Sequence, residues 1–498
     1  MPIKSKPLII LILLLTLTSL GCGLTSMFMP EPTDTPIPPT ATPIPPTATP
    51  IPPSPTPAVP RTVTLRANGT GDFPDLPSAV ADLLSGSTIL LEPGTYTLTE
   101  TLVINKTLII QGEDFDNTTI IGSSPDAVLN FTGPGNIILE GINFTYTGTE
   151  WAYVVKIEDG GFDINNCRFS GGVRNEDEEV GGNGLYILGS GNGKVSGSLF
   201  EDNQHHGLSI GENVNILVEG CITENNSHHG IGFWNASSGT LRNCRSLYNS
   251  NGFSTNDQAV VTFENNEAQG NTYFGYYAFD SSTLKATRNI SFENGYSGFG
   301  CDDETTAVFD NNNAYQNIES GFASFGSCQM TVRYNESFEN GLHGFSAQEQ
   351  SQGIFEHNFA YVNTDSGFIA FDDAVMTAQD NQSYNNGLQG FGAQDQSELY
   401  IENNSIYDNG AAGVRLSGTT IGSIYNNYIS GNSLSGIIIT DEAFVLIEEN
   451  EIYDNLEAIM AFFEFASGEV YNNTCSGNNL GIEIYDSADP FIDDNACQ

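Results

Sequence analysis

Short apolar runs recur along the C-terminal two-thirds of the chain at a nearly constant interval. Each run follows a glycine and alternates with small or polar residues, as in GFGAQ from Gly390, and none has helical spacing. Steps between successive copies are 23 residues, with two exceptions of 22. The aligned positions are Gly184, Gly207, Gly230, Gly252, Gly275, Gly298, Gly321, Gly344, Gly367, Gly390, Gly413, Gly436, Ala458 and Gly481. Such a period predicts stacked β-coils, one repeat per coil.

Within one coil the apolar positions predict three strands. Phe391 and Ala393 alternate with polar or small neighbours in the first strand, Leu399 and Ile401 do so in the second, and Ile406 lies in the third. We therefore predict an all-β protein, a single-stranded right-handed parallel β-helix of about 23 residues per coil over residues 62–498.

Asparagines mark the corners between these strands in two rows. Asn tolerates the left-handed conformation that a sharp bend needs. Because stacked coils lie about 4.8 Å apart, each amide can donate to one neighbour and accept from the other. One row is Asn243, Asn266, Asn289, Asn312, Asn335, Asn358, Asn381, Asn404, Asn427 and Asn450. The other is Asn203, Asn226, Asn249, Asn271, Asn294, Asn317, Asn340, Asn363, Asn386, Asn409, Asn432, Asn455 and Asn478.

The start of the predicted solenoid contains one amphipathic helix. Between Asp75 and Leu84, residues Leu76, Val80, Leu83 and Leu84 share one helical face. Because an open solenoid end exposes apolar core, we predict that this short helix caps the N-terminal end.

Two stretches resemble known β-helix proteins. GTGDF (Gly69–Phe73), followed by the helix and by TILLEPGTYTLTETLVINKTLIIQG, resembles the opening of the pectate lyase and pectin esterase class. The later N-x-h-x-x-N-x-x-x-G-h units resemble the parallel β-helix repeats of bacterial surface proteins and polysaccharide enzymes. The resemblance implies the fold and leaves the activity open, since the repeat residues are the scaffold itself.

The N-terminal residues have the composition of an export signal. Residues 1–21 combine Lys4 and Lys6 with an apolar run that is too short to span a membrane, and they predict a signal peptide. Cys22 ends this run and resembles the lipidated cysteine of bacterial lipoproteins. The alternative is ordinary signal cleavage. With lipidation, the protein is exported, anchored to the bacterial cell membrane and displayed at the cell surface.

Residues 22–61 are predicted to be a Pro/Thr-rich linker, in which TPIPPTA occurs twice. Proline favours an extended polyproline conformation, which could hold the folded domain roughly 90 Å from its anchor.

The charge balance limits the partners. The chain has 15 Lys and Arg against 61 Asp and Glu, a formal charge of −46. Such a surface repels nucleic acid and anionic polymers unless cations intervene. We predict a monomer without a nucleic-acid partner.

An acidic row follows the reference glycines by five positions. Stacked carboxylates repel one another unless they are solvated or bridged by cations, and Ca²⁺ prefers oxygen ligands. The row predicts a calcium strip; the alternative is a solvated turn row that keeps the solenoid soluble. Its candidate ligands are Asp257, Asp280, Asp303, Asp372 and Asp395, and the row also holds Glu212, Glu349, Asp441 and Asp486.

Aromatic residues occur on alternate coils, four positions after the glycine. The register directs this position outward or to the strand edge, and rings beside amides suit a linear sugar chain. The alternative is an aromatic cluster covering a corner. The candidate carbohydrate-binding residues are Trp234, Phe279, Phe325, Phe371, Gln348 and Gln394. A second aromatic row, whose direction the sequence leaves open, is Phe292, Tyr315, Phe338, Tyr361, Tyr384 and Tyr407.

Two histidine pairs, His205–His206 and His228–His229, stand 23 residues apart. They therefore stack on adjacent coils, and the insertion at 171–183 is placed to overhang them. Imidazoles near acids can bind zinc or act as general acids and bases, so these four are the candidate catalytic residues. The alternative is that a duplicated coil repeated two variable loop positions.

Seven cysteines remain after Cys22. Cys221 and Cys244 lie one coil apart, as do Cys475 and Cys497, so each pair is spaced for a disulfide. The second pair would close the last coil. The alternative is a stack of buried thiols.

Two function classes follow. The first is a surface-anchored protein that binds extracellular polysaccharide, divalent cations, or both. The second is a polysaccharide lyase, hydrolase or epimerase acting at one lateral groove. The sequence shows no compact acid, base and cation constellation, which favours the first class.

Overall fold

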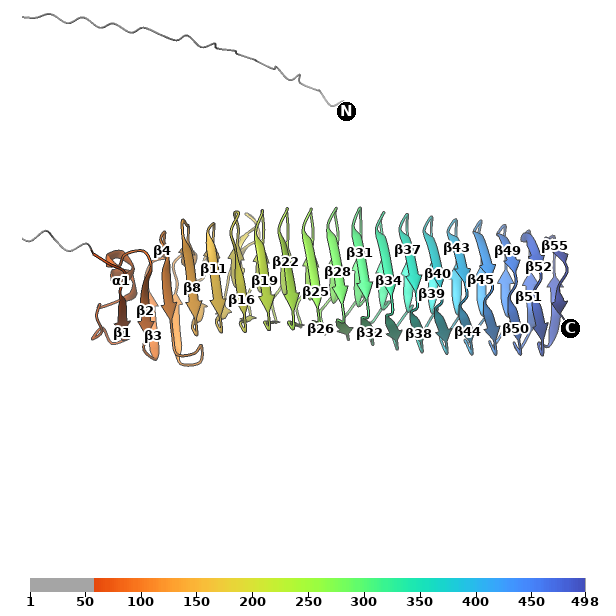
Figure 1. Ribbon diagram of the computed structural model, residues 1–498, viewed down its shortest axis with the longest axis horizontal. Helices are drawn as coiled ribbons and strands as arrows, with labels where there is room; N and C mark the ends of the chain where they lie inside the picture. Colours follow the sequence, from red (N-terminus) through yellow and green to blue (C-terminus); the bar gives the residue numbers. More distant parts are fainter. Residues whose placement is uncertain (1–57, 498) are drawn as a thin grey trace, which may run out of the picture. The chain divides into compact units, whose positions relative to one another are not determined.

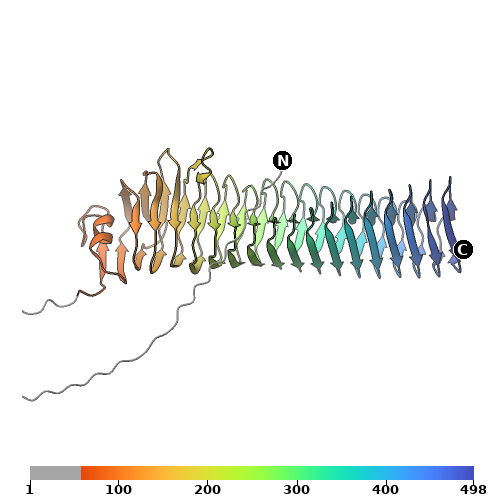
Figure 2. The ribbon, with the colours of Figure 1, turned by 90° about the horizontal axis from the view of Figure 1, so that it is seen from above.

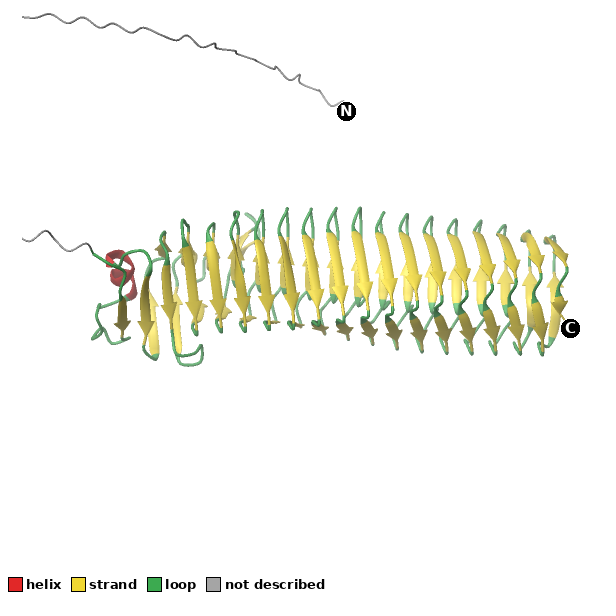
Figure 3. Cartoon of the chain, in the orientation of Figure 1, coloured by secondary structure: helices red, strands yellow, loops and turns green. Residues whose placement is uncertain are grey.

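The computed structural model describes residues 58–497, which form a right-handed parallel β-helix, as predicted (Figures 1 and 2). Strands dominate this part of the chain, and the one helix in it, α1, lies at the N-terminal end (Figure 3). The predicted signal peptide, Cys22 and nearly all of the predicted linker lie outside the described residues.

Each coil contributes one strand to each of three parallel sheets. In the coil that follows Gly390 these are β42 (Phe391–Ala393), β43 (Glu398–Glu402) and β44 (Ser405–Tyr407). We call the sheets that contain them the first, second and third sheet. Strands one coil apart pair in register, so that Phe391 pairs with Val414. The second sheet has 19 strands, which accounts for the length of the solenoid.

The interior is filled by side chains that stack from coil to coil. Seven rings at the first strand position stack with centroids 4.5–5.0 Å apart. They are Phe253, Tyr276, Phe299, Phe322, Phe345, Phe368 and Phe391, all fully buried. Where Val414 ends this stack, Leu416 stands two positions later in place of Ala393. Large and small residues therefore exchange places, so that each layer is filled.

Both Asn rows form buried ladders. Asn358 Nδ2 donates to Asn381 Oδ1 (3.0 Å) and to the Val332 carbonyl (2.9 Å). Its own Oδ1 accepts from the backbone N–H of Asn335 (3.0 Å) and from Asn335 Nδ2 (3.1 Å). Each rung thus satisfies backbone groups that the bend removes from the strand ladders.

The left-handed residue of each corner is the one before the ladder asparagine, contrary to our expectation. His357 precedes Asn358 with φ +57°, and Asn403 precedes Asn404 with φ +57°. The ladder amide is needed for its hydrogen bonds and not for its backbone freedom. Asn243 is itself such a left-handed residue (φ +56°), and Cys244 occupies the ladder place in its coil.

One position of the predicted repeat register was wrong by one residue. β48 (Ile437–Ile439) pairs with β51 (Ala458–Phe462) so that Ile437 faces Met460. Gly436 therefore aligns with Ile459, not with Ala458. The shift also adds Glu464 to the acidic row.

The glycines that open the first strands are required by close packing. A Cβ on Gly298 would lie 2.8 Å from the Gly321 carbonyl oxygen and 2.9 Å from Asn317 Nδ2. The carbonyl oxygen is held by strand pairing and the amide nitrogen by the Asn ladder, so neither atom can move away. This position therefore has no room for a side chain.

The N-terminal end is covered as predicted. β1 (Thr62–Leu65) leads into α1 (Leu76–Asp82), and β2 (Ser87–Leu91), β3 (Gly94–Leu98) and β4 (Leu102–Ile104) follow. The Asp75 carboxylate accepts from the Ser78 N–H (2.8 Å) and caps the helix. Leu76, Val80 and Leu83 are buried, whereas Leu84, which follows the C-cap residue Leu83, is exposed.

At the other end, the last coil has β54 (Leu480–Ile484), β55 (Asp489–Asp493) and β56 (Ala496–Cys497). Among residues 58–497 no helix is both long and apolar enough for a membrane span. The Cys475–Cys497 disulfide is present, and a second one joins Cys301 to Cys328, which the sequence analysis did not predict.

Cys221 and Cys244 do not form the disulfide that their spacing allowed. Both are free thiols, as is Cys167, and all three are buried. Burial raises the pKa of the Cys167 thiol to about 12. The alternative of buried thiols therefore holds at these positions.

Candidate functional site

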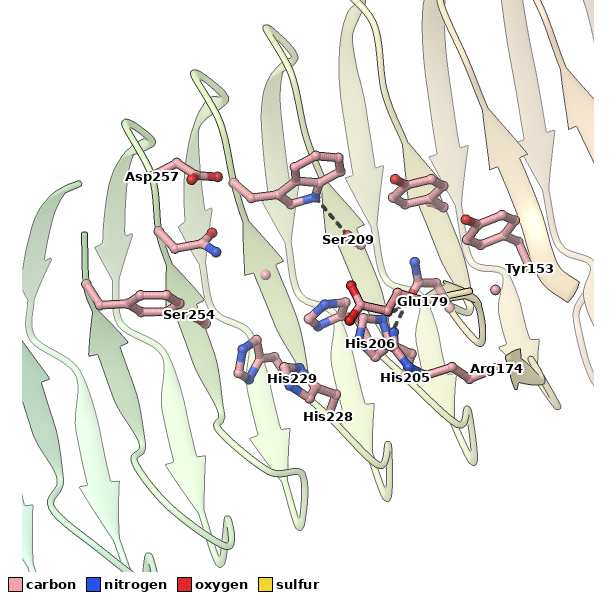
Figure 4. Close-up of a pocket in the computed structure, with 17 residues that line it drawn as sticks. Tyr153, Arg174, Glu179, His205, His206, Ser209, His228, His229, Ser254 and Asp257 are labelled. Carbon is pink, nitrogen blue, oxygen red and sulfur yellow. Dashed lines mark hydrogen bonds between the residues drawn. The ribbon is translucent and has the colours of Figure 1, made fainter. Parts of the chain in front are cut away.

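A pocket of about 410 Å³ opens on the outward face of the first sheet (Figure 4). Its strands are β10 (Ala152–Ile157), β15 (Leu185–Ile187), β18 (Leu208–Ile210), β21 (Ile231–Phe233) and β24 (Phe253–Thr255). All four histidines predicted from the sequence line it, together with Trp234, Phe279 and Asp257.

The histidines come from the turns that precede β18 and β21. His205 and His206 are followed by Gly207, and His228 and His229 by Gly230. The His228 N–H donates to the His205 carbonyl (3.1 Å), which holds the two turns in register. The rings of His205 and His228 stack with centroids 4.7 Å apart, and those of His206 and His228 lie 4.8 Å apart, edge to face.

Two asparagines determine the tautomers of two of these rings. The backbone N–H of His206 donates to Asn183 Oδ1 (3.1 Å), so His205 Nδ1, which lies 2.8 Å from the same oxygen, must carry a proton. Asn251 Nδ2 faces His229 Nδ1 at 3.2 Å, so that nitrogen must accept. A neutral His205 therefore has its free lone pair on Nε2, and a neutral His229 carries its proton on Nε2.

All four imidazoles are held neutral. Burial, then the charges of His228 and Arg174, lowers the pKa of His205 to about 3. Burial is also the main cause that lowers the pKa of His206, His228 and His229. At neutral pH His205, His206 and His228 therefore each keep a lone pair that can bind a metal ion, whereas the lone pair of His229 accepts from Asn251.

The insertion overhangs the histidines, as predicted. It forms a hairpin of β13 (Arg174–Asn175) and β14 (Val180–Gly181). Arg174 and Glu179 line the pocket together with the histidines (Figure 4). Arg174 Nε is paired with Glu176 at 3.0 Å. The hairpin closes one side of a surface that is open elsewhere along the solenoid.

Aromatic rings form the opposite wall. Tyr153 and Tyr186 stack at 4.6 Å, and Tyr186 and Trp234 at 6.0 Å. Trp234 Nε1 donates to Ser209 Oγ (3.0 Å), the contact drawn in Figure 4. The indole lies over Gly211 of the preceding coil, where any side chain would collide with it. Its orientation is therefore set by the sequence of two coils.

The alternate-coil aromatic row continues along the same face. Phe325 and Phe371 lie beyond the pocket and are partly buried; Gln348 occupies the same position on the coil between them, and Gln394 on the coil after Phe371. The gap between Phe279 and Phe325 is bridged by a cluster that the sequence analysis missed. Phe274 stacks on Tyr277 (4.2 Å), Tyr277 on Phe279 (5.2 Å), and Phe274 lies edge-on to Phe325 (6.3 Å).

The second aromatic row lies elsewhere, on the outward face of the third sheet. From Phe292 to Tyr407 its six rings stack face to face, with centroids 4.9–5.2 Å apart. Burial raises the pKa of Tyr361 in this row to about 12. Each ring covers the face of the next, so the row presents only ring edges outward.

The acidic row occupies the left-handed position of the turn after the first strand. Asp257, Asp280, Asp303, Asp372 and Asp395 all have φ between +52° and +62°. Each carboxylate accepts from a backbone N–H of the preceding coil, as Asp257 does from Asn235 (2.7 Å) and Asp280 from Asp257 (3.2 Å). The corresponding bonds of Asp303, Asp372 and Asp395 are 3.1–3.4 Å. This gives the row a structural role, and calcium binding there stays a prediction.

The sequence profile described as "Right handed beta helix region" matches residues 152–300, 287–391 and 368–497. The chain belongs to this right-handed β-helix family. Comparison with curated proteins found no match.

Solved structures similar to this β-helix protein include three of different kinds. The periplasmic alginate epimerase AlgG is 14% identical over 73% of this chain and 82% of its own, with a TM-score of 0.46. Pectate lyase Pel9A is 18% identical over 57% of this chain and 80% of its own, with a TM-score of 0.34. The pre-mature gene product 12 of bacteriophage phi29 is 9% identical over 81% of this chain and 69% of its own, with a TM-score of 0.54. At these identities the likeness shows the fold alone.

The sequence analysis missed two aromatic residues of the pocket. Tyr186 stands two positions after Gly184, where the strand alternation already directs a side chain outward, so the register contained the signal. Tyr153 precedes the first clear repeat and had no register to place it. In this β-helix protein the site therefore lies where the regular repeat begins and an insertion interrupts it.

Proposed function

We propose that the protein binds a linear extracellular polysaccharide along the outward face of the first sheet, with the histidine pocket as the anchoring subsite. The observation that carries this proposal is the aromatic wall of Tyr153, Tyr186 and Trp234 opposite a cluster of polar rings. Sugars offer both apolar ring faces and hydroxyl groups, so a wall of each kind suits them.

The spacing of the aromatic row supports a polymer. Trp234, Phe279, Phe325 and Phe371 stand two coils apart, an interval of about 9.6 Å. A sugar ring between two aromatic faces needs roughly 3.5–4.0 Å on each side, so the interval between Trp234 and Phe279 would admit one ring. The interval between Phe279 and Phe325 already holds Tyr277 and Phe274. Among the described residues the four rings of the row contact other rings and not one another: Trp234 and Phe279 are stacked, Phe325 is met edge-on and Phe371 is tilted.

The intervening coils supply polar groups at the same position. Asn256, Asp302 and Gln348 stand between the aromatic residues, and Gln394 follows the last of them; all four can hydrogen-bond to hydroxyls. Aromatic and polar positions therefore alternate at regular intervals along a straight axis. Such a surface suits a linear glycan, whose units also repeat at regular intervals.

The charge favours an uncharged polymer. With a formal charge of −46, the surface repels polyuronates at low salt. Ca²⁺ held between the acidic row and a polyuronate would reverse this, so calcium is part of the proposal for acidic glycans. Anchoring through Cys22 and the Pro/Thr-rich linker would display the solenoid at the cell surface, where such polymers occur.

A second candidate function is chemical modification of the bound polysaccharide. It is favoured by neutral imidazoles beside the Arg174 guanidinium and Tyr186 in one pocket. A neutral imidazole can abstract a proton, and a guanidinium can stabilise the anion that results. Lyase or epimerase chemistry is the class that these groups serve.

The binding proposal is tested by replacing Trp234 with alanine and measuring retention on a panel of neutral glycans and polyuronates, with and without Ca²⁺. Loss of a central aromatic contact is expected to weaken binding on the order of 30-fold, or about 2 kcal/mol. Phe325→Ala and Phe371→Ala are expected to weaken binding of long chains more than of short oligosaccharides, because these residues lie beyond the pocket.

Tyr384→Ala is the matched control, because Tyr384 belongs to the stacked row of the third sheet. It should leave retention unchanged. Equal retention by the Trp234→Ala variant and the unchanged protein would refute the proposal. Unsaturated or epimerised products after incubation would establish the second candidate function instead.

A further inference from the structure

We propose that His205, His206 and His228 form a binding site for one divalent transition-metal ion of the zinc class, with an open coordination position that faces the pocket. The proposal stands apart from polysaccharide binding, because it rests on the histidine cluster alone.

The geometry is that of a three-ligand site. One ring nitrogen from each of the three histidines lies within 4.8 Å of the other two. Tetrahedral ligands about 2.0–2.1 Å from Zn²⁺ are about 3.3 Å apart. Side-chain rotations that move the ring nitrogens by about an ångström would therefore complete the site. Among residues 58–497 this is the group of histidine, cysteine and acidic side chains that meets such spacing.

Hydrogen bonds prepare one ligand and exclude another. Asn183 Oδ1 accepts the His205 Nδ1 proton at 2.8 Å, which directs the lone pair of Nε2 away from Asn183. An oxygen acceptor on the far nitrogen is the usual second contact of a metal-binding histidine. His229 has its lone pair occupied by Asn251 Nδ2 at 3.2 Å, which explains why it stands outside the group of three.

Two nitrogen atoms of the cluster have no hydrogen-bond partner. They are Nδ1 of His206 and Nδ1 of His228, both inaccessible to solvent. Buried polar atoms are normally paired, and an unpaired one costs about 1–3 kcal/mol. Metal coordination would engage the lone pairs of such rings.

The ligand type selects the ion. Imidazole nitrogen binds Zn²⁺, Cu²⁺ and Ni²⁺, whereas Ca²⁺ and Mg²⁺ require oxygen. Arg174, a positive charge that lines the pocket and would repel a cation, is paired with Glu176 at 3.0 Å. Glu179 also lines the pocket and adds a carboxylate to it. Three protein ligands and a free position are the arrangement of zinc sites that bind water or substrate.

The proposal is tested by titrating the purified, metal-stripped protein with Zn²⁺ in a calorimeter and by recording the visible spectrum with Co²⁺. One equivalent of Zn²⁺ is expected to bind, with no competition from excess Ca²⁺. The Co²⁺ spectrum should show tetrahedral d–d bands without the thiolate charge-transfer band that Cys167, Cys221 or Cys244 would produce.

His205→Gln and His228→Gln are each expected to raise the Kd for Zn²⁺ at least about a hundredfold, and Asn183→Ala about tenfold. His357→Gln is the matched control, since His357 is a half-exposed histidine stacked on Tyr334 elsewhere on the surface. His229→Gln should also keep the affinity. Thermal unfolding of each metal-free variant verifies that it is folded.

The proposal is overturned if the unchanged protein takes up no Zn²⁺, or if the His205→Gln and His228→Gln variants bind it as tightly as the His357→Gln control. A thiolate band with Co²⁺ would overturn it as well. Because no glycan is present in these measurements, their result is independent of whether the aromatic wall binds polysaccharide.

Discussion

Asn358→Asp is expected to lower the free energy of unfolding by on the order of 3–5 kcal/mol at neutral pH, the usual cost of an uncompensated buried charge. The substitution keeps the size of the side chain and removes the Nδ2 donor. Asn381 Oδ1 and the Val332 carbonyl, both acceptors, would then face a carboxylate at 2.9–3.0 Å. One changed atom thus breaks a ladder that runs through successive coils.

The penalty should depend on pH in a definite direction. Burial among acceptors raises the pKa of the new carboxyl in the folded protein above its unfolded value of about 3.9. The protonated acid can donate one of the two lost bonds, so the destabilisation is smallest below pH 4 and grows as pH rises through the raised pKa. Urea unfolding of variant and parent at both ends of this range measures the effect.

Asn385→Asp is the matched control. Asn385 is exposed and has φ +54°, a conformation that Asp also tolerates. Its effect should stay within about 0.5 kcal/mol at any pH. Equal stability of the Asn358→Asp variant and this control would mean that the ladders do not hold the coils together.

Deletion of residues 414–436, one whole coil, is expected to leave a folded protein that retains its ligand pocket. Gly413 would then join Ile437, and each interrupted row is restored by a residue of the same kind. Asn409 would meet Asn455, Asn404 would meet Asn450, and Asp395 would meet Asp441. In a solenoid each coil contacts only its neighbours, so the thermal midpoint should change by only about a few degrees.

Deletion of residues 414–433 is the control and should lower the thermal midpoint much further. It leaves Leu434, Ser435 and Gly436 as three extra residues before Ile437, where β48 begins. The turn must then either bulge outward or shift the strand by an odd number of positions, which would point its apolar side chains outward. Circular dichroism and thermal unfolding distinguish the two deletions; similar midpoints for both would contradict a register set by the side-chain rows.

The contrast between the two aromatic rows shows how structure limits the choice of a binding surface. Both rows could bind sugars from their composition alone. The row on the third sheet repeats on every coil, and its rings cover one another at 4.9–5.2 Å. The row on the first sheet repeats on every second coil, so its rings do not stack on one another. The spacing of the rings, more than the residue type, makes the row on the first sheet the candidate binding surface.

The sequence by itself determined the solenoid, because its information is local and repeated. Gly390, Asn404 and Phe391 each recur with counterparts at nearly the same interval, and a repeat of that length has one arrangement that buries every apolar run. The same repetition places His205 and His228 on adjacent coils. Where the period broke, at Ala458 and Asn243, the predicted register was wrong by one residue.

Only the tertiary structure decided what the exceptions to the repeat do. The insertion that contains Arg174 and Glu179 has no counterpart in other coils, so no period could place it over the histidines. Tyr153 reaches the same pocket from a strand before the regular register begins. The tautomers of His205 and His229 depend on hydrogen bonds with Asn183 and Asn251. These bonds join neighbouring coils and decide which ring nitrogen carries the proton. Periodicity predicts what every coil shares, whereas a site is built from what one coil has and its neighbours lack.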